Sequence, residues 1–289
     1  MSASNGVAKR SELEQRALRP NVTIPRPFLR WAGSKRFALK YILELLPSRF
    51  RIYREPFLGS GALYFLLRPE RAVLSDICAE LIETFLAVRD NAGAVARYLR
   101  GMKPQKRLFD YIKKHRSAGP FKRAAEFIYL NKSAWNGLYR VNSLGEFNVP
   151  FGRPKTDFIA DFQNLRECGS LLRSRGVSLQ ICDFEDNILD AKRGDLVYLD
   201  PPFVTGHSNN GFVDYNEELF SWDDQERLAH IAVWLAKQGV HVIASNANHK
   251  AILQLYPGFG SRPITRFSTL ASDLDKRRPV SEILLYSKP

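Results

Sequence analysis

The chain has 289 residues, enough to bury a hydrophobic core in one large domain or in one domain with an insert. With 45% apolar and 25% charged residues it resembles a folded globular protein; no apolar run is long enough to cross a membrane, and the polar N-terminus lacks a signal-peptide core. A net charge of +13 favours a polyanionic partner but does not require one.

The cysteines and histidines give no sign of a metal site. The three cysteines, at positions 78, 168 and 182, have no CxxC spacing and do not form an even set that would suggest disulfides. The five histidines are scattered without the spacing of metal ligands. We therefore expect a reduced protein of the cytoplasm, with no membrane partner and no metal.

The first part of the chain alternates between expected helices and strands. Residues 1–20 are polar and lack a sustained apolar stripe, so we interpret them as a flexible tail or a short helix. A strand, a glycine turn, a helix and a second strand then predict a parallel βαβ unit with a right-handed crossover. The expected elements are a helix over 36–46, a strand over 52–57, a helix over 61–68, a strand over 72–76 and a helix over 78–90.

The middle of the chain, roughly residues 91–174, differs in composition, and we interpret it as an inserted module. It is dense in Lys and Arg, and within it LYRV and EFNV flank NSLG, which predicts a β-hairpin whose Gly145 adopts a positive φ. The alternation then resumes, which predicts an α/β fold. The later elements are strands over 177–182, 195–200, 240–246 and 281–287, and helices over about 222–237 and 249–256.

A glycine turn in EPFLGSGALYF (55–65) is the first candidate binding element. Gly59 and Gly61 at a strand end allow a ligand to approach the backbone, and the next helix presents its N-terminal amides. Tyr64 replaces the third glycine of a dinucleotide fingerprint, which argues against a pyrophosphate grip. A nucleoside without phosphates, such as S-adenosylmethionine (SAM), would fit, with Asp76 accepting hydrogen bonds from its ribose. A simple tight turn is the alternative.

The stretch YLDPPF (198–203) is the second candidate element. Its adjacent prolines exclude a helix interior or a central ladder, so it is a stiff loop after an apolar strand. The Asp200 carboxylate and a carbonyl of Pro201 or Pro202 could accept the hydrogens of an exocyclic amine on adenine or cytosine, and so prepare its nitrogen to attack a methyl group. Phe203 offers a face on which an extruded base can stack. A turn without chemistry is the alternative.

Taken in order, the motifs of the chain resemble those of the Dam-type DNA adenine-N6 methyltransferases, which are class alpha amino-methyltransferases of the D12 family. The resemblance covers nearly the whole chain beyond the tail. It implies a Rossmann-like, SAM-dependent methyltransferase core over 21–90 and 175–289, with 91–174 inserted as a mostly helical DNA-recognition domain bearing the β-hairpin. The motifs are FLRWAGSKR (28–36), EPFLGSG (55–61), SD (75–76), NGLYRVNSLGEFNVPFG (136–152), DPPF (200–203), SN (245–246) and SEILLY (281–286).

The resemblance also implies roles for individual residues. Those that would line the cofactor pocket are Trp31, Lys35, Phe57, Gly59, Gly61, Asp76, Asp183 and Asp200. Those that would hold the target amine are Asp200, Pro201, Pro202 and Phe203.

Five further residues are implied to contact DNA. Trp135 would wedge into the base stack, and Arg30 would touch the duplex. Asn136, Leu138 and Arg140 would face bases, and Asn with adenine or Arg with guanine are common major-groove pairs. From residue types alone, Trp135 could instead be a core aromatic and Arg140 a solvated charge.

Three departures from the family pattern matter. Ser34 stands where glycine is usual, Phe203 replaces the commoner tyrosine, and Pro154 replaces a frequent base-contacting aromatic. The last change weakens the expectation of GATC as the site. The polar, glycine-bearing stretch 205–218 is either a flap over the target base, with Tyr215 as the position to test, or an idle loop.

The function expected from these observations is SAM-dependent methylation of adenine N6 in double-stranded DNA by base flipping, within GATC, with S-adenosylhomocysteine as product and a monomeric enzyme. Methylation of adenine at a related site or of cytosine N4 is the alternative within enzymes. A catalytically silent, sequence-specific DNA-binding protein is the alternative outside them. RNA is a weaker candidate, because the major groove of A-form RNA is out of reach of a hairpin.

Overall fold

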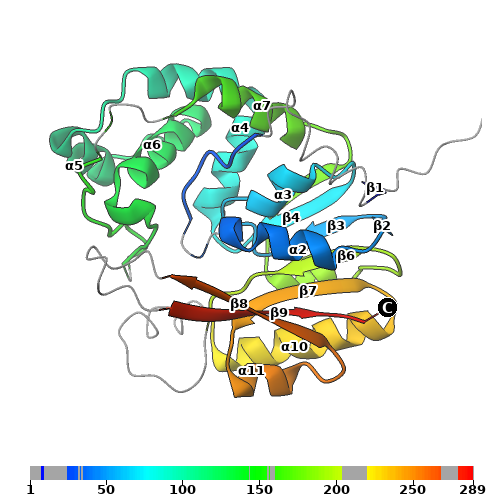
Figure 1. Cartoon of the computed structure of the whole chain (residues 1–289). Coiled ribbons are helices and arrows are strands. Elements are labelled where there is room, and N and C mark those ends of the chain that lie inside the picture. Colours follow the sequence, from blue (N-terminus) through cyan, green and yellow to red (C-terminus); the bar gives the residue numbers. More distant parts are fainter. Residues whose placement is uncertain are drawn as a thin grey trace, which may run out of the picture.

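A seven-stranded sheet forms the centre of the computed structural model, which describes residues 8–9, 25–31, 33, 35–142, 144–154, 156, 160–203, 220–267 and 279–288. The strand order is β5-β4-β3-β6-β7-β9-β8 (Figure 1). The strands are β3 (Tyr53–Glu55), β4 (Ala72–Asp76), β5 (Val177–Ile181), β6 (Leu196–Leu199), β7 (His241–Ala247), β8 (Gly260–Phe267) and β9 (Pro279–Tyr286).

The strands from β5 to β7 run parallel, and β9 lies antiparallel between β7 and β8. Tyr53 of β3 pairs with Ala72 on one side and Leu196 on the other, so the chain switches from one half of the sheet to the other at β3 and β6. Apart from the antiparallel β9, this order is that of the dinucleotide-binding fold. The predicted βαβ unit and α/β, Rossmann-like fold are confirmed.

Alternate residues of each central strand supply two hydrophobic cores. Along β6, Leu196 and Tyr198 pack into one core while Val197 and Leu199 pack into the other, and all four are buried. Helices therefore cover both faces of the sheet, as parallel strands require (Figure 1). The first face carries α2 (Leu39–Leu45), α3 (Ala62–Leu67), α4 (Ala79–Arg100) and α7 (Phe162–Leu172), and the second carries α8 (Phe184–Ile188), α10 (Trp222–Lys237) and α11 (Lys250–Leu255).

A helical segment extends from the first core, at the top of Figure 1. Helix α4 bends at Asn91, whose backbone is not helical (φ −152°, ψ 76°), and packs along α6 (Pro120–Ser133) near α5 (Lys106–Lys114). After α6 the chain forms a 3-10 turn, η2 (Trp135–Gly137). The following loop contains the antiparallel bridge between Val141 and Phe147.

The predicted β-hairpin is present only as a loop with the isolated bridge between Val141 and Phe147, and not as two strands. The Asn142 side chain contributes to the difference, since its Oδ1 accepts from the Glu146 N–H and so replaces one ladder bond, while the Asn142 N–H still donates to the Glu146 carbonyl. Gly145 adopts a φ of 74°, so the predicted positive φ is confirmed.

Most other predicted elements are found with shifts of one or two residues at their ends. Helix 222–237 is found with the predicted bounds, because a capping box between Ser221 and Asp224 fixes its start. The helix predicted to end at residue 90 continues to Arg100, and the helix predicted over 36–46 divides into η1 (Lys35–Phe37) and α2. The sequence does not predict strand β8, because Pro263 and two arginines interrupt the apolar pattern of this edge strand.

The N-terminal segment contributes one short strand. Of the expected tail, only residues 8–9 are described; they form β1 (Ala8–Lys9), which pairs with β2 (Arg49–Phe50). Within the described ranges no helix is long and apolar enough to cross a membrane.

Candidate active site and DNA-recognition surface

The carboxyl ends of β3, β4 and β6 meet at one edge of the sheet, at the point where the strand order reverses. Open α/β sheets bind ligands at this switch point. Three carboxylates come to the same edge, because Glu55 ends β3, Asp76 ends β4 and Asp200 follows β6. The topology thus brings together the glycine turn, the ribose candidate and the amine-binding loop that the sequence predicts.

The glycine turn after β3 has the backbone conformation that glycine permits. Gly59 has a φ of 48° and Gly61 a φ of 67°. The Gly59 N–H donates a hydrogen bond of 3.0 Å to Asp76 Oδ2, and the Cys78 N–H donates one of 3.0 Å to Oδ1. A Cβ atom at Gly59 would lie 2.7 Å from Cδ1 of Trp31, so the indole covers the turn directly. Trp31, Gly59 and Asp76 therefore form one unit.

Lys35 and Asp200 form a buried ion pair at the entrance to the DPPF loop. The Lys35 ammonium lies 2.8 Å from Asp200 Oδ1 and 3.8 Å from Glu282 Oε2 on β9. It also donates to the Gly33 carbonyl at 2.9 Å and lies 4.4 Å from the centre of the Phe203 ring, a cation–π contact. The Lys35 ammonium therefore connects the motif FLRWAGSKR (28–36) to the DPPF loop.

Burial perturbs the acids of this edge. It raises the pKa of Asp200 to about 6, with the Lys35 ammonium lowering that pKa and the Glu282 carboxylate raising it. Burial also raises the pKa of Glu55 to about 8, and the Asp200 and Asp76 carboxylates add to the rise. Perturbed carboxyl groups gathered at a switch point are typical of a functional site.

Phe57 and Asp183, the two remaining cofactor candidates, face the α8 side. The Phe57 ring stacks on Phe184 with centroids 5.6 Å apart. The Asp183 carboxylate caps α8 by accepting from the Glu185 N–H, and its Oδ2 lies 3.0 Å from Nη2 of Arg227. These contacts give Asp183 a structural role that the sequence did not indicate.

The candidate DNA-binding residues gather around η2. Trp135 is 46% exposed and Arg140 is exposed, so the structure places neither in a core. Asn136, also exposed, adopts a left-handed conformation with a φ of 53°. Leu138 is half-buried where the chain leaves η2.

Arg30 is connected to the same turn from a distant part of the chain. Its backbone N–H and carbonyl both bind the side-chain amide of buried Asn131, at 2.8 Å each. Its side chain packs against Gly137, where an added Cβ would lie 2.4 Å from Cδ of Arg30. The η2 turn and Arg30 of the FLRWAGSKR motif are therefore packed against each other on one surface.

Comparison with known proteins shows the family of the chain. The family model for D12 class N6 adenine-specific DNA methyltransferases matches residues 31–270. The chain belongs to this family. Relatives include the type II methyltransferases M1.LlaDCHI of Lactococcus lactis subsp. cremoris (33% identity over 268 residues, 90% of this chain and 94% of the relative) and M.MjaIII of Methanocaldococcus jannaschii (34% over 289 residues, 91% and 99%). The DNA adenine methylase of Escherichia coli K12 is 29% identical over 272 residues, 91% of this chain and 96% of the relative.

The chain is therefore an adenine-specific DNA methyltransferase, and DNA is its substrate. Methyltransferases of this family generally use SAM. In the part of the chain that the structure describes, no group of three or more His, Cys, Asp or Glu side chains is placed to hold a metal ion.

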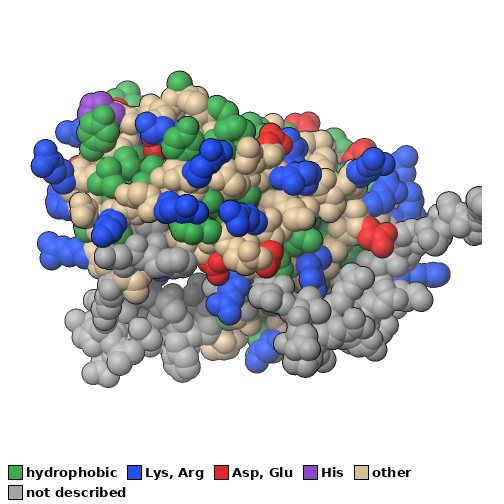
Figure 2. Space-filling model, turned by 90° about the horizontal axis from the view of Figure 1, so that it is seen from above, with side chains coloured by type: hydrophobic (Ala, Val, Ile, Leu, Met, Phe, Trp, Pro, Cys, Tyr) green, Lys and Arg blue, Asp and Glu red, His purple; other side chains and the backbone are tan. Residues whose placement is uncertain are grey.

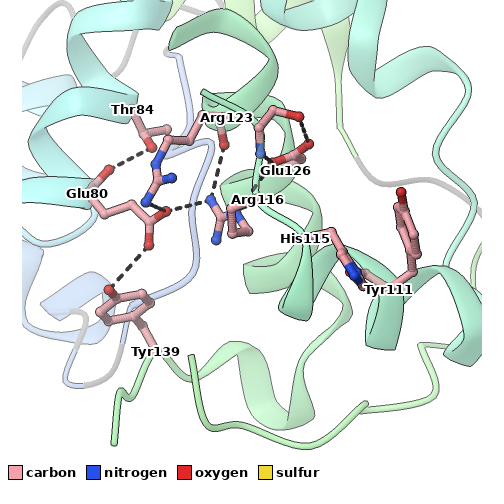
Figure 3. A network of polar contacts seen from close by, with 9 residues as sticks. Glu80, Thr84, Tyr111, His115, Arg116, Arg123, Glu126 and Tyr139 are labelled. Atoms are coloured by element: carbon pink, nitrogen blue, oxygen red, sulfur yellow. Dashed lines mark hydrogen bonds and ion pairs between the residues drawn. The ribbon is translucent and has the colours of Figure 1, made fainter. Parts of the chain in front are cut away.

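A polar network joins the start of α4 to the loop that follows η2 in the methyltransferase (Figure 3). Glu80, in the first turn of α4, forms ion pairs with Arg116 at 2.5 Å and Arg123 at 3.4 Å. The Tyr139 hydroxyl, from the loop after η2, donates to Glu80 Oε2 at 3.4 Å. The Tyr139 ring stacks on Trp31 with centroids 5.5 Å apart and an interplanar angle of 17°. Tyr139 thus contacts both Trp31, which covers the glycine turn, and Glu80 of α4.

The face formed by the helical segment carries many Lys and Arg side chains (Figure 2). Such a face suits the phosphate backbone of DNA, because binding releases counterions. Arg116 and Arg123 add no net charge to it, since the two acids Glu80 and Glu126 pair with them. Exposed basic residues of this segment are Arg97, Arg100, Lys103, Lys106, Arg107, Lys114 and Lys122.

Sequence reasoning missed several residues of the site and could not place others. The motifs do not predict a role for Glu282, although an acid inside the apolar run SEILLY is a usable signal. They also predict none for Ile77, which directly follows Asp76 and is 70% exposed. Ser34 and the stretch 205–218, with Tyr215, lie outside the described residues.

Proposed function

We propose that the methyltransferase transfers a methyl group from SAM to adenine N6 in double-stranded DNA, within GATC, after the target adenine has turned out of the duplex. The observation that carries the proposal is the Asp200 carboxylate, buried beside the Lys35 ammonium on a proline-stiffened loop at the switch point of the sheet. Residues 21–90 and 175–289 would form the catalytic domain and residues 91–174 the recognition domain of a monomeric enzyme. The bend of α4 at Asn91 supports this boundary.

The residues at the carboxyl edge fit SAM. Asp76 is partly exposed beside the exposed, apolar Ile77, a pair suited to a ribose and an adenine ring. Glu55 is 3% exposed with a pKa raised to about 8, and the positively charged amino group of SAM would lower that pKa and favour the carboxylate that binds it. Gly59 lets the Trp31 indole lie directly against the turn, and the indole would form one wall of the pocket. Phe57 and Asp183 would form the far wall of this pocket.

SAM supplies a methyl group made electrophilic by its sulfonium. Asp200 would accept one hydrogen of the target amine, and a proline carbonyl of the loop would accept the other, which draws the nitrogen lone pair out of the ring. Lys35 lowers the pKa of Asp200 and so favours the carboxylate at neutral pH. Phe203 would stack on the extruded base, and the methylated amine would then lose its proton to Asp200 or to water.

The surface around η2 would read the DNA. Trp135, half-exposed at the end of α6, would fill the gap left by the flipped base. Asn136 and Arg140 carry the amide and guanidinium groups that recognise adenine and guanine edges in the major groove. Arg30 and Leu138, packed beside them, would complete the contact, and the basic face of the helical segment would bind the flanking phosphates.

The test is methyl transfer from labelled SAM to duplexes that contain GATC, single-base variants of it, or no site, followed by identification of the methylated nucleoside. We expect N6-methyladenine confined to GATC, loss of transfer in Asp200→Ala, and normal transfer in Glu70→Ala, which removes an exposed acid just before β4. Methyladenine at another sequence would overturn the assignment of GATC. N4-methylcytosine, or tight site-specific binding without transfer, would overturn the proposed reaction.

A further inference from the structure

Two buried side-chain amides form a relay that ends on the DPPF loop. Gln225 of α10 is fully buried, and its Nε2 donates a hydrogen bond of 3.1 Å to the Pro202 carbonyl. Its Oε1 accepts a hydrogen bond of 3.0 Å from Nδ2 of Asn246, which is also fully buried, on β7. Asn246 Oδ1 in turn accepts from the Ala247 N–H at 2.8 Å.

The direction of this relay is determined at both ends. The Pro202 carbonyl can only accept a hydrogen bond, so Gln225 must present its NH₂ group to it. The Ala247 N–H can only donate, so Asn246 must present its oxygen to it and its NH₂ group to Gln225. Neither amide can flip without placing like groups against each other.

The relay reaches the loop at a position where the loop has no donor of its own. Pro201 and Pro202 lack N–H groups, so their peptide planes are oriented by donors to their carbonyls and by the fixed φ of proline. The Pro202 carbonyl belongs to the peptide plane that leads into Phe203, whose ring lies 4.4 Å from the Lys35 ammonium on its other side. Orienting that carbonyl therefore orients the start of Phe203.

We infer that Gln225 is a positioning residue for methyl transfer. It holds the Pro202 carbonyl toward α10 and so aims the Phe203 ring at the target base. The Pro201 carbonyl is then the one that accepts the target amine together with Asp200. The inference rests on the proposed role of residues 200–203. Asn246 belongs to the same device, since it sets the orientation of the Gln225 amide.

The supports of Gln225 are consistent with a fixed position. The capping box of Ser221 and Asp224 fixes the first turn of α10, just before Gln225. Arg227, one turn further, binds Asp183 and Glu185 at the start of α8, at 3.0 Å and 2.8 Å. Helix α10 is thus held on both sides of the residue that contacts the loop.

The experiment compares single-turnover methyl transfer at saturating SAM and DNA in the full-length wild type, Gln225→Glu and Gln225→Leu. Gln225→Glu keeps the side-chain shape, and its rate and that of the wild type are compared at pH 9, above the pKa of about 8 that burial gives Glu55, so that the new carboxylate is ionised and cannot donate to Pro202. We expect both variants to lose roughly 10- to 100-fold in rate, with SAM and DNA dissociation constants within about threefold of wild type, because a small misalignment of a reacting group has this effect. Retained binding also shows that the variants are folded.

The control is Asn187→Leu, which removes another fully buried amide that donates to the Val73 carbonyl and to Ser75. Its melting temperature should fall while its saturated transfer rate stays near wild type. A wild-type rate in Gln225→Glu, or an equal loss in Asn187→Leu, would overturn the inference. Absence of transfer in the wild type itself would instead overturn the proposed function.

A double-mutant cycle with Asn246→Leu separates a relay from independent damage. If the two amides act as one unit, Gln225→Leu/Asn246→Leu will be little slower than Gln225→Leu alone, since the second change removes an interaction that is already lost. Multiplying losses would show that the two residues act separately, which contradicts the relay.

Discussion

The Lys35 ammonium lies 2.8 Å from the Asp200 carboxylate, in a site where both side chains are largely buried. Lys35, from the segment before the first strand of the sheet, thus stabilises the ionised form of Asp200, which follows β6. Because burial raises the pKa of Asp200 while Lys35 lowers it, the ionisation of Asp200 depends on this contact.

The first prediction concerns pH. Asp200 must be ionised to accept an amine hydrogen, and its pKa is raised to about 6, so the single-turnover rate should fall as the pH drops through about 6. Lys35→Met removes the ammonium that lowers this pKa, so the midpoint should move to higher pH by roughly one unit or more. Lys40→Met, at an exposed lysine, is the matched control. An unchanged midpoint in Lys35→Met would contradict the role of the ion pair.

The second prediction concerns the glycine turn. Gly59→Ala places a Cβ in a left-handed conformation, which costs about 1–2 kcal/mol, and 2.7 Å from Trp31, so the indole must move. We expect at least about tenfold weaker SAM binding, which equals 1.4 kcal/mol, by titration calorimetry. Gly119→Ala, where nothing lies within 4 Å of the new Cβ, should bind SAM like the wild type. Wild-type SAM affinity in Gly59→Ala would place the cofactor away from this turn.

The third prediction concerns Trp135. Since its side chain is 46% exposed, Trp135→Ala should change the free energy of unfolding by no more than about 1 kcal/mol. If the indole compensates for the flipped base, methyl transfer should fall roughly 10- to 100-fold, consistent with about 1–3 kcal/mol per aromatic–base stack, and 2-aminopurine fluorescence at the target position should decrease. Trp234→Ala removes an equally exposed tryptophan on α10 and should leave both unchanged. Equal effects of the two changes would exclude a specific role for Trp135.

The sequence predicted those parts of this enzyme that depend on local pattern. Helix 222–237 and strand 72–76 were found with their predicted bounds, because a capping box and an apolar run determine them within a few residues. The candidates Gly59 and Asp76 meet at one edge because the carboxyl ends of parallel strands share an edge, whereas Trp31 reaches them from the segment before η1.

Contacts between distant segments could not be predicted in this way. Glu282 reaches Lys35 only because β9 enters antiparallel next to β7, and no local pattern specifies that pairing. Gln225 looks like any polar residue of an amphipathic helix until the fold places it under the Pro202 carbonyl. The side chain of Asn142 shortened the expected hairpin by binding the backbone of its own loop.

The last prediction concerns Tyr139, which lies between the two base-reading candidates Leu138 and Arg140. Its ring stacks on Trp31, the residue that covers the glycine turn, and its hydroxyl reaches Glu80 near the start of α4, just after Asp76 (Figure 3). A residue that contacts both binding surfaces can transmit strain between them, so we expect SAM to raise DNA affinity and DNA to raise SAM affinity by the same factor.

Tyr139→Leu removes the stack, so this factor should fall toward one, while Tyr139→Phe keeps the stack and should retain most of the coupling. The measurement is the dissociation constant of the DNA duplex with and without the cofactor analogue sinefungin, which cannot donate a methyl group. Tyr111→Leu is the control, because it removes another ring stack, with His115 just after α5, that does not involve Trp31. A coupling factor that survives Tyr139→Leu, or that falls equally in Tyr111→Leu, would show that the two surfaces communicate by another route or not at all.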